Sequence, residues 1–115
     1  METGNDRVLT FRCPYLKSDV ELTLERERHI AGRHPDLLPE YKACISETLL
    51  DPDAVRQSPR VMDARMFSKW YNDVKGGKHV VVVVMSGAGA AGRSWIMTAY
   101  LARRLAGGEA EWKKD

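Results

Sequence analysis

The stretch Lys78–Ser86 reads KHVVVVVMS, and its five consecutive valines indicate how the rest of the chain is arranged. β-Branched residues favour strands. An uninterrupted apolar run of this length is typical of a central strand that is covered on both faces. The sequence therefore predicts a β-sheet with residues 78–86 near its middle.

The segments on either side of the valines predict neighbouring strands. Residues 62–71 alternate between two faces, as a strand does. Residues 54–58 and 94–101 predict two more strands. The last of these segments also fits a helix, because apolar residues recur there at four-residue spacing: Met97, Leu101 and Leu105. We therefore expect an antiparallel meander of four strands.

Two helices are expected before these strands. Thr23 predicts the N-cap of a helix from about Leu24 to Arg33. His34–Pro35 ends it, because a residue before proline avoids the helical conformation. Asp36 then predicts the start of a second helix, from about Leu37 to Leu50, whose apolar residues recur at helical spacing. The expected fold class is α+β, with two N-terminal helices packed on a four-stranded antiparallel β-sheet.

The flanks of the chain are short. Val8–Cys13 predicts a strand, and Val20–Leu22 predicts a second short extended piece. We expect the 115 residues to form a single domain, 1–115, with flexible tails at 1–6 and 106–115.

Composition excludes several classes of protein. Hydrophobic residues make up 43% of the chain and charged residues 30%, which is typical of a soluble globular protein rather than a disordered one. The longest apolar run, Val80–Met85, is far shorter than the roughly 20 residues that span a bilayer, so no membrane partner is expected. The net charge of +2 is too small to indicate nucleic-acid binding by itself.

The two cysteines, Cys13 and Cys44, are too few for a disulfide framework or a thiolate zinc site. We expect both to be reduced thiols in a cytoplasmic protein, although a single bridge between them stays open. His29 and His34 are five residues apart, not the four that places two ligands on one helical face, so no metal is expected.

Gly87–Gly92 matches the G-x-G-x-x-G pattern of dinucleotide-binding loops. That function also requires a helix after the glycines, a second strand, and an acidic residue about 20 positions further on. The chain after Gly92 ends in a polar segment without such a strand. We therefore expect these glycines to serve a connection between strands, and we expect no cofactor.

The first predicted helix has a basic face. Arg26, His29 and Arg33 follow one another at spacings of three and four, and His34 lies at the helix end. On composition alone, a solvated charged face is the favoured interpretation. The functional alternative is a phosphate site, in which histidine transfers protons near neutral pH and arginine binds a phosphate with two parallel hydrogen bonds.

Two strands carry side chains that suit nucleic acid. Arg65, Lys69 and Tyr71 share one face of residues 62–71 with Phe67, and alternating cations and rings can bind a single strand. An ordinary solvent-exposed face is the alternative. Thr98 and Tyr100 share a face of the last strand and offer hydroxyl groups to a phosphate.

Several of these segments together resemble the barnase–EndoU–colicin–RelE (BECR) superfamily, in particular its phage-associated and toxin-like nucleases. The matching segments follow one another in the chain: Val20–Thr23 (VELT), His29–Pro35 (HI-x-x-RHP), Leu49–Asp53 (L-x-DPD) and Ile96–Tyr100, which ends Thr-Ala-Tyr. The resemblance implies helices packed on a four-stranded antiparallel sheet and metal-independent cleavage of RNA. It also favours a strand over residues 94–101.

The resemblance assigns catalytic roles to His29, Arg33, Thr98 and Tyr100. The further residues expected to bind substrate are Arg26, His34, Arg65, Lys69 and Tyr71. The expected reaction is attack of a ribose 2′-hydroxyl on the adjacent phosphorus, which gives a 2′,3′-cyclic phosphate. The expected partners are an RNA substrate and an inhibitory or immunity protein. A non-catalytic RNA- or protein-binding module with the same fold is the alternative, and a third is an interaction protein that buries Trp70, Trp95 or Trp112 against a partner.

Overall fold

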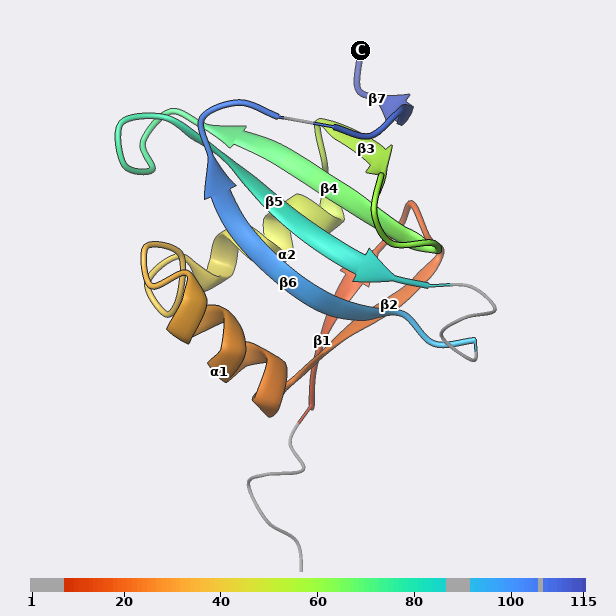
Figure 1. The fold of residues 1–115 in the computed structure, drawn as a ribbon, viewed down its shortest axis with the longest axis horizontal. Helices are drawn as coiled ribbons and strands as arrows, with labels where there is room; N and C mark the ends of the chain where they lie inside the picture. The colour runs from red at the N-terminus through yellow and green to blue at the C-terminus, as the bar shows by residue number, and fades with distance from the viewer. Residues whose placement is uncertain (1–7, 87–91, 106) are drawn as a thin grey trace, which may run out of the picture.

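A computed structural model describes residues 8–86, 92–105 and 107–115. In this part of the chain, two helices pack against one curled sheet of seven strands, in the order β1-β2-β6-β5-β4-β3-β7 (Figure 1). The elements are β1 Val8–Cys13, β2 Ser18–Thr23, α1 Leu24–Arg33, α2 Lys42–Leu50, β3 Ala54–Gln57, β4 Ala64–Tyr71, β5 Lys78–Met85, β6 Trp95–Ala102 and β7 Ala110–Lys113.

The expected fold class, two helices on a four-stranded antiparallel sheet, is wrong. The sheet contains both parallel and antiparallel pairs, has seven strands instead of four, and curls into a half-barrel. With two short helices beside it, the described chain is mostly β. A β1–β2 hairpin, paired from Val8↔Thr23 to Cys13↔Ser18, extends the sheet beyond β6 through one parallel bridge, Glu21↔Trp95. At the other edge β7 pairs with β3. Both additions cover edges that a four-stranded meander would leave unpaired.

The tail prediction for 106–115 also differs from the structure, because residues 110–113 form β7. Two side chains fix this strand over β3. Trp112 lies opposite Val55 and stacks against Tyr15 at a ring distance of 6.1 Å. Glu111 accepts hydrogen bonds from three side chains of other elements, described below. Long-range contacts of this kind leave no periodic signal in a four-residue polar segment.

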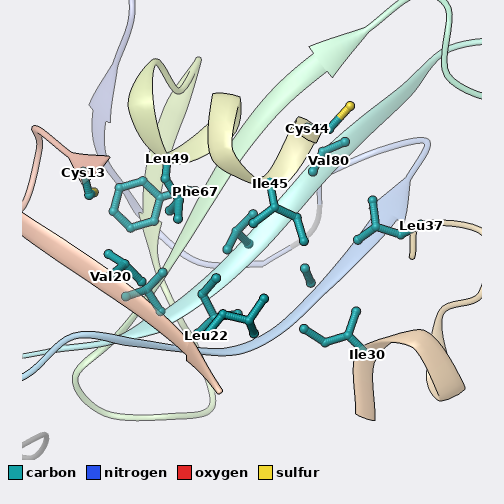
Figure 2. Close-up of a cluster of buried hydrophobic side chains, with 14 of the residues drawn as sticks. Cys13, Val20, Leu22, Ile30, Leu37, Cys44, Ile45, Leu49, Phe67 and Val80 are labelled. Carbon is teal, nitrogen blue, oxygen red and sulfur yellow. The ribbon is translucent and has the colours of Figure 1, made fainter. Parts of the chain in front are cut away.

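The valines of β5 divide between the two faces of the sheet. The inner face contains Val80, Val82 and Val84 together with Phe67, and these side chains share one core cluster with Ile45 of α2 (Figure 2). Val81 and Val83 lie on the opposite, outer face. The strand is therefore buried on both sides, and the outer face carries a smaller apolar cluster over β4, β5 and β6.

Helix α1 has the predicted bounds. The side chain of Thr23 accepts a hydrogen bond from the Arg26 backbone N–H at 3.1 Å, and the helix ends with the His34 N–H bonded to the Ile30 carbonyl at 2.7 Å. The second helix was expected from Leu37 but begins at Lys42. Pro39 accounts for this difference, because proline lacks an N–H and the residue before it avoids the helical conformation.

Within residues 94–105, where a helix was the alternative, Trp95–Ala102 form the strand β6. β6 pairs antiparallel with β5, so the connection that contains the glycine motif joins antiparallel neighbours. Most of that motif, residues 87–91, lies outside the described residues, as does the expected N-terminal tail at 1–6. Cys13 and Cys44 are both free thiols. Neither helix of the described chain is long and apolar enough to cross a membrane.

Candidate functional site

Helix α1 lies along the edge of β6. Strand β2 bridges β6 at Trp95, and among the described residues no strand lies beside the rest of this edge. The helix covers that edge and inserts Ile30 into the inner core. Arg26 fixes its position, because one guanidinium N–H donates to the carbonyl of Met97 at 3.1 Å. The basic face of α1 therefore borders the outer face of the sheet.

A bulge in β6 sets which side chains reach that outer face. Val84 pairs with Ile96, whereas Val83 pairs with Thr98, so Met97 is an extra residue in the ladder. Ile96 consequently packs in the inner core, while Thr98 shares the outer face with Val83. Tyr100, opposite Val81, continues the outer row.

These elements enclose a groove of about 750 Å³. One wall comes from α1 and its end, the floor from β4 and β6, and the other wall from the connection between β3 and β4. The lining residues are Arg26, His29, Arg33, His34, Ser58, Pro59, Arg60, Met66, Met97, Thr98, Tyr100 and Gly107. The four residues predicted to be catalytic, His29, Arg33, Thr98 and Tyr100, thus lie in one groove together with Arg26 and His34.

The groove is cationic. Three arginines and two histidines line it, and none of its described lining residues is acidic. Arg33 and Arg60 are exposed and make no ion pair within the described chain, while Arg26 makes one long contact of 3.5 Å with Glu25. By contrast, a neighbouring hollow beside β2 is lined by both carboxylates and arginines. The groove therefore suits an anion, and its volume leaves space for one with several charges.

Tyr100 lies at the centre of the groove's chemistry. Its ring is 5.8 Å from that of His34. Burial raises the pKa of Tyr100 above its ordinary value, so its hydroxyl stays protonated at neutral pH. Together with Thr98 it offers two neutral donors beside two imidazoles. This set of side chains can bind a phosphate and transfer a proton. The apolar floor formed by Met66 and Met97 offers a surface on which a nucleobase can pack.

Arg65, Lys69 and Tyr71 do not reach the groove. They lie on the inner side of β4, with the fully buried Phe67 between them. Their polar groups have internal partners: Arg65 binds Glu111 at 2.9 Å, Lys69 binds the Asp51 carbonyl at 3.0 Å, and the Tyr71 hydroxyl donates to Glu47 at 2.7 Å. These contacts give the three side chains structural roles. Burial, followed by the hydrogen bond to Glu47, raises the pKa of Tyr71.

Sequence reasoning missed Arg60, Ser58 and Met66. The alternation of residues 62–71 places Met66 on the face opposite Arg65 and Phe67. That pattern does not show that this face borders a groove. Arg60 lies in a connection, where no periodicity indicates direction. Ser58 stabilises the turn in that connection, because its hydroxyl oxygen accepts hydrogen bonds from the backbone N–H groups of Arg60 and Val61.

No family model, curated protein or solved structure matches this chain. The described residues contain no group of three or more histidine, cysteine, aspartate and glutamate side chains placed to hold a metal ion.

Proposed function

We propose that the groove binds single-stranded RNA and cleaves it by internal transesterification. The observation that carries this proposal is the convergence of His29, Arg33, Thr98 and Tyr100, from two distant segments, in one groove whose described lining has no carboxylate. The resemblance to the BECR nucleases, which rests on the same residues, supports it. Fold alone would not, because similar folds host different activities.

The reaction needs two proton transfers. As the 2′-oxygen attacks phosphorus, its proton passes to a base, and the bond from phosphorus to the 5′-oxygen breaks as that oxygen receives a proton. The two imidazoles of the groove, His29 and His34, supply the base and the acid. The products are a 2′,3′-cyclic phosphate and a 5′-hydroxyl.

The remaining groups act on charge and position. The pentacoordinate phosphorane carries an additional negative charge, which the guanidinium of Arg33 stabilises by paired hydrogen bonds. Thr98 and the protonated Tyr100 hydroxyl orient the phosphate oxygens from the floor of the groove. The nucleophile belongs to the substrate, so we expect the reaction to proceed in EDTA.

The test is incubation of the purified protein with total RNA in EDTA, followed by detection of cyclic-phosphate ends. We expect His29→Ala to lower the cleavage rate by about 100-fold or more, the scale for loss of a general acid or base. Arg33→Lys should also lower the rate, since lysine cannot make a bidentate contact. Thr98→Val removes one hydroxyl with little change of shape and should have a smaller effect.

Arg28→Ala is the matched control, because Arg28 is an exposed cation of the same helix that does not line the groove. The thermal midpoint of each variant separates folding from chemistry. A folded His29→Ala variant that cleaves at the original rate contradicts the catalytic assignment. RNA binding without cleavage in the unmodified protein supports a non-catalytic RNA-binding module instead.

A further inference from the structure

A second, smaller cavity of about 80 Å³ adjoins the groove on the outer face. It shares Met66 and Tyr100 with the groove. Cross-strand pairs place Ser68, Val81 and Tyr100 in one row of the sheet, directly beside the row of Arg56, Met66, Val83 and Thr98. The lining residues with polar side-chain groups are Arg56, Ser68, Tyr100 and Arg104.

Two polar atoms in the wall of this cavity, behind its surface, have no hydrogen-bond partner within the described chain. Ser68 is 1% exposed and its hydroxyl makes no hydrogen bond, although it is fully buried. The Nε of Arg56 is likewise buried and unpaired. Arg56 is nevertheless held in place, because its Nη1 donates to the Gly108 carbonyl at 3.2 Å. Buried polar groups in folded proteins are nearly always satisfied, so two such groups in the wall of one small cavity leave hydrogen-bonding capacity for a ligand that enters it.

The cavity selects the chemistry of that ligand. Its lining residues include two arginines, Arg56 and Arg104, and two residues with hydroxyl groups, Ser68 and Tyr100, and no carboxylate is among the described lining residues. An anion therefore fits. A single water occupies about 30 Å³, so the cavity has space for a group of several heavy atoms but not for a nucleobase with its ribose. A tetrahedral oxyanion meets both conditions, and guanidinium groups match its geometry.

We propose that this cavity is a phosphate subsite, which binds the phosphate of the nucleotide next to the one in the groove. This inference rests on the proposed function. Ser68 lies two residues beyond Met66 along β4, a distance of about 7 Å in a strand. That spacing is comparable to one nucleotide step of an extended single strand, so adjacent phosphates can occupy the groove and the cavity together.

The first experiment follows thermal stability with inorganic phosphate as the probe. In phosphate-free buffer, we expect Ser68→Ala to have an unchanged or higher thermal midpoint, because it removes a buried hydroxyl that has no partner. Phosphate should raise the midpoint of the unmodified protein and have little effect on Ser68→Ala. A lower midpoint for Ser68→Ala without phosphate would show that the hydroxyl has an internal partner, and would overturn the proposal.

The second experiment uses deoxydinucleotides, which lack the attacking 2′-hydroxyl and therefore cannot react. Affinity is compared for the plain dinucleotide and for forms with an added 5′- or 3′-terminal phosphate. One of the two phosphorylated forms should bind at least about tenfold more tightly, and Ser68→Ala or Arg56→Lys should remove this increment but not the binding of the plain form. Arg103→Ala is the control, since Arg103 is exposed and does not line the cavity.

The outcomes separate the subsite from the function of the groove. If the plain dinucleotide binds and the terminal phosphate gives an increment that Ser68→Ala leaves intact, the subsite is refuted while RNA binding in the groove is retained. If no dinucleotide binds but free phosphate still stabilises only the unmodified protein, the cavity is a site for a small anion. That result contradicts both the RNA assignment of the subsite and the proposed function.

Discussion

Replacement of Glu111 by glutamine tests how β7 is attached to the rest of the sheet. The carboxylate of Glu111 accepts three hydrogen bonds, from the Tyr15 hydroxyl at 2.9 Å, Gln57 Nε2 at 3.0 Å and Arg65 Nε at 2.9 Å. It thereby connects the turn after β1 with β3 and β4. Its side chain is 17% exposed, so the ion pair with Arg65 is partly shielded from water.

The cost can be worked out from these contacts. The amide of Glu111→Gln keeps one accepting oxygen, loses the charge that strengthens all three bonds, and presents an NH₂ group where an acceptor is needed. With a net contribution of about 1 kcal/mol per hydrogen bond, we expect a loss of about 1–3 kcal/mol of unfolding free energy. Each kcal/mol corresponds to about 4 °C in a domain of this size, so the thermal midpoint should fall by about 4–12 °C.

Urea unfolding and thermal melts at pH 7 measure this change. Glu109→Gln is the control, since Glu109 is exposed and contributes only its backbone carbonyl to β3. A midpoint for Glu111→Gln within about 1 °C of the unmodified protein would refute the reasoning, because it would mean that the three bonds contribute no net stability.

The same contact predicts a dependence on pH. Burial alone would raise the pKa of Glu111, but the hydrogen bonds from Arg65, Gln57 and Tyr15 outweigh burial and hold the pKa below its ordinary value of 4.5. A group with a depressed folded-state pKa contributes stability above its unfolded pKa and loses it as the pH falls through the folded value. The stability difference between the unmodified protein and Glu111→Gln should therefore be complete at pH 7 and shrink below about pH 4.5. A difference that is constant from pH 7 to pH 3 would contradict this assignment.

Two further substitutions test elements that position the groove. Gly108→Ala should destabilise the protein and weaken phosphate binding at the Arg56 cavity. The reason is that Gly108 has φ +74° and an added Cβ would collide with the Gln57 carbonyl. Equal urea unfolding curves for Gly108→Ala and the unmodified protein would contradict this prediction. Thr23→Ala removes the N-cap of α1 and should lower the free energy of unfolding by about 1 kcal/mol, as measured in urea. The RNA cleavage rate should also fall, because fraying of α1 displaces the side chains that line the groove. Thr10→Ala, at an exposed position of β1, is the control.

The sequence could predict α1 and the positions of β1 to β6 because their signals are local. Thr23 and the His34–Pro35 pair define both ends of α1, and the β5 valines specify a strand whatever its neighbours are. The strand β7 and the pairing at both edges of the sheet were not predictable in this way. Pairing of the β1–β2 hairpin with β6, or of β7 with β3, depends on contacts between distant segments such as Glu21↔Trp95.

The same distinction holds for the site. Helical spacing places His29 and Arg33 on one face of α1, and strand spacing places Thr98 and Tyr100 on one face of β6. Alternation shows which residues share a face but not which face a helix covers. For that reason Arg65 was grouped correctly with its strand neighbours but expected on an open surface, whereas α2 covers the inner side of this sheet.

The bulge at Met97 decides which side chains of β6 face the groove. Side chains of a regular strand alternate strictly, so a strand of the same length without the bulge would turn Thr98 and Tyr100 to the inner face. They would then keep their chemistry but exchange the groove for the hydrophobic interior, and Ala99 would take their place. Deletion of Met97 would have no such effect, because Thr98 would follow Ile96 in normal alternation. A family of related chains under selection for this groove should accordingly either keep the bulge or lose one residue at that point, and should tolerate replacements within the strand.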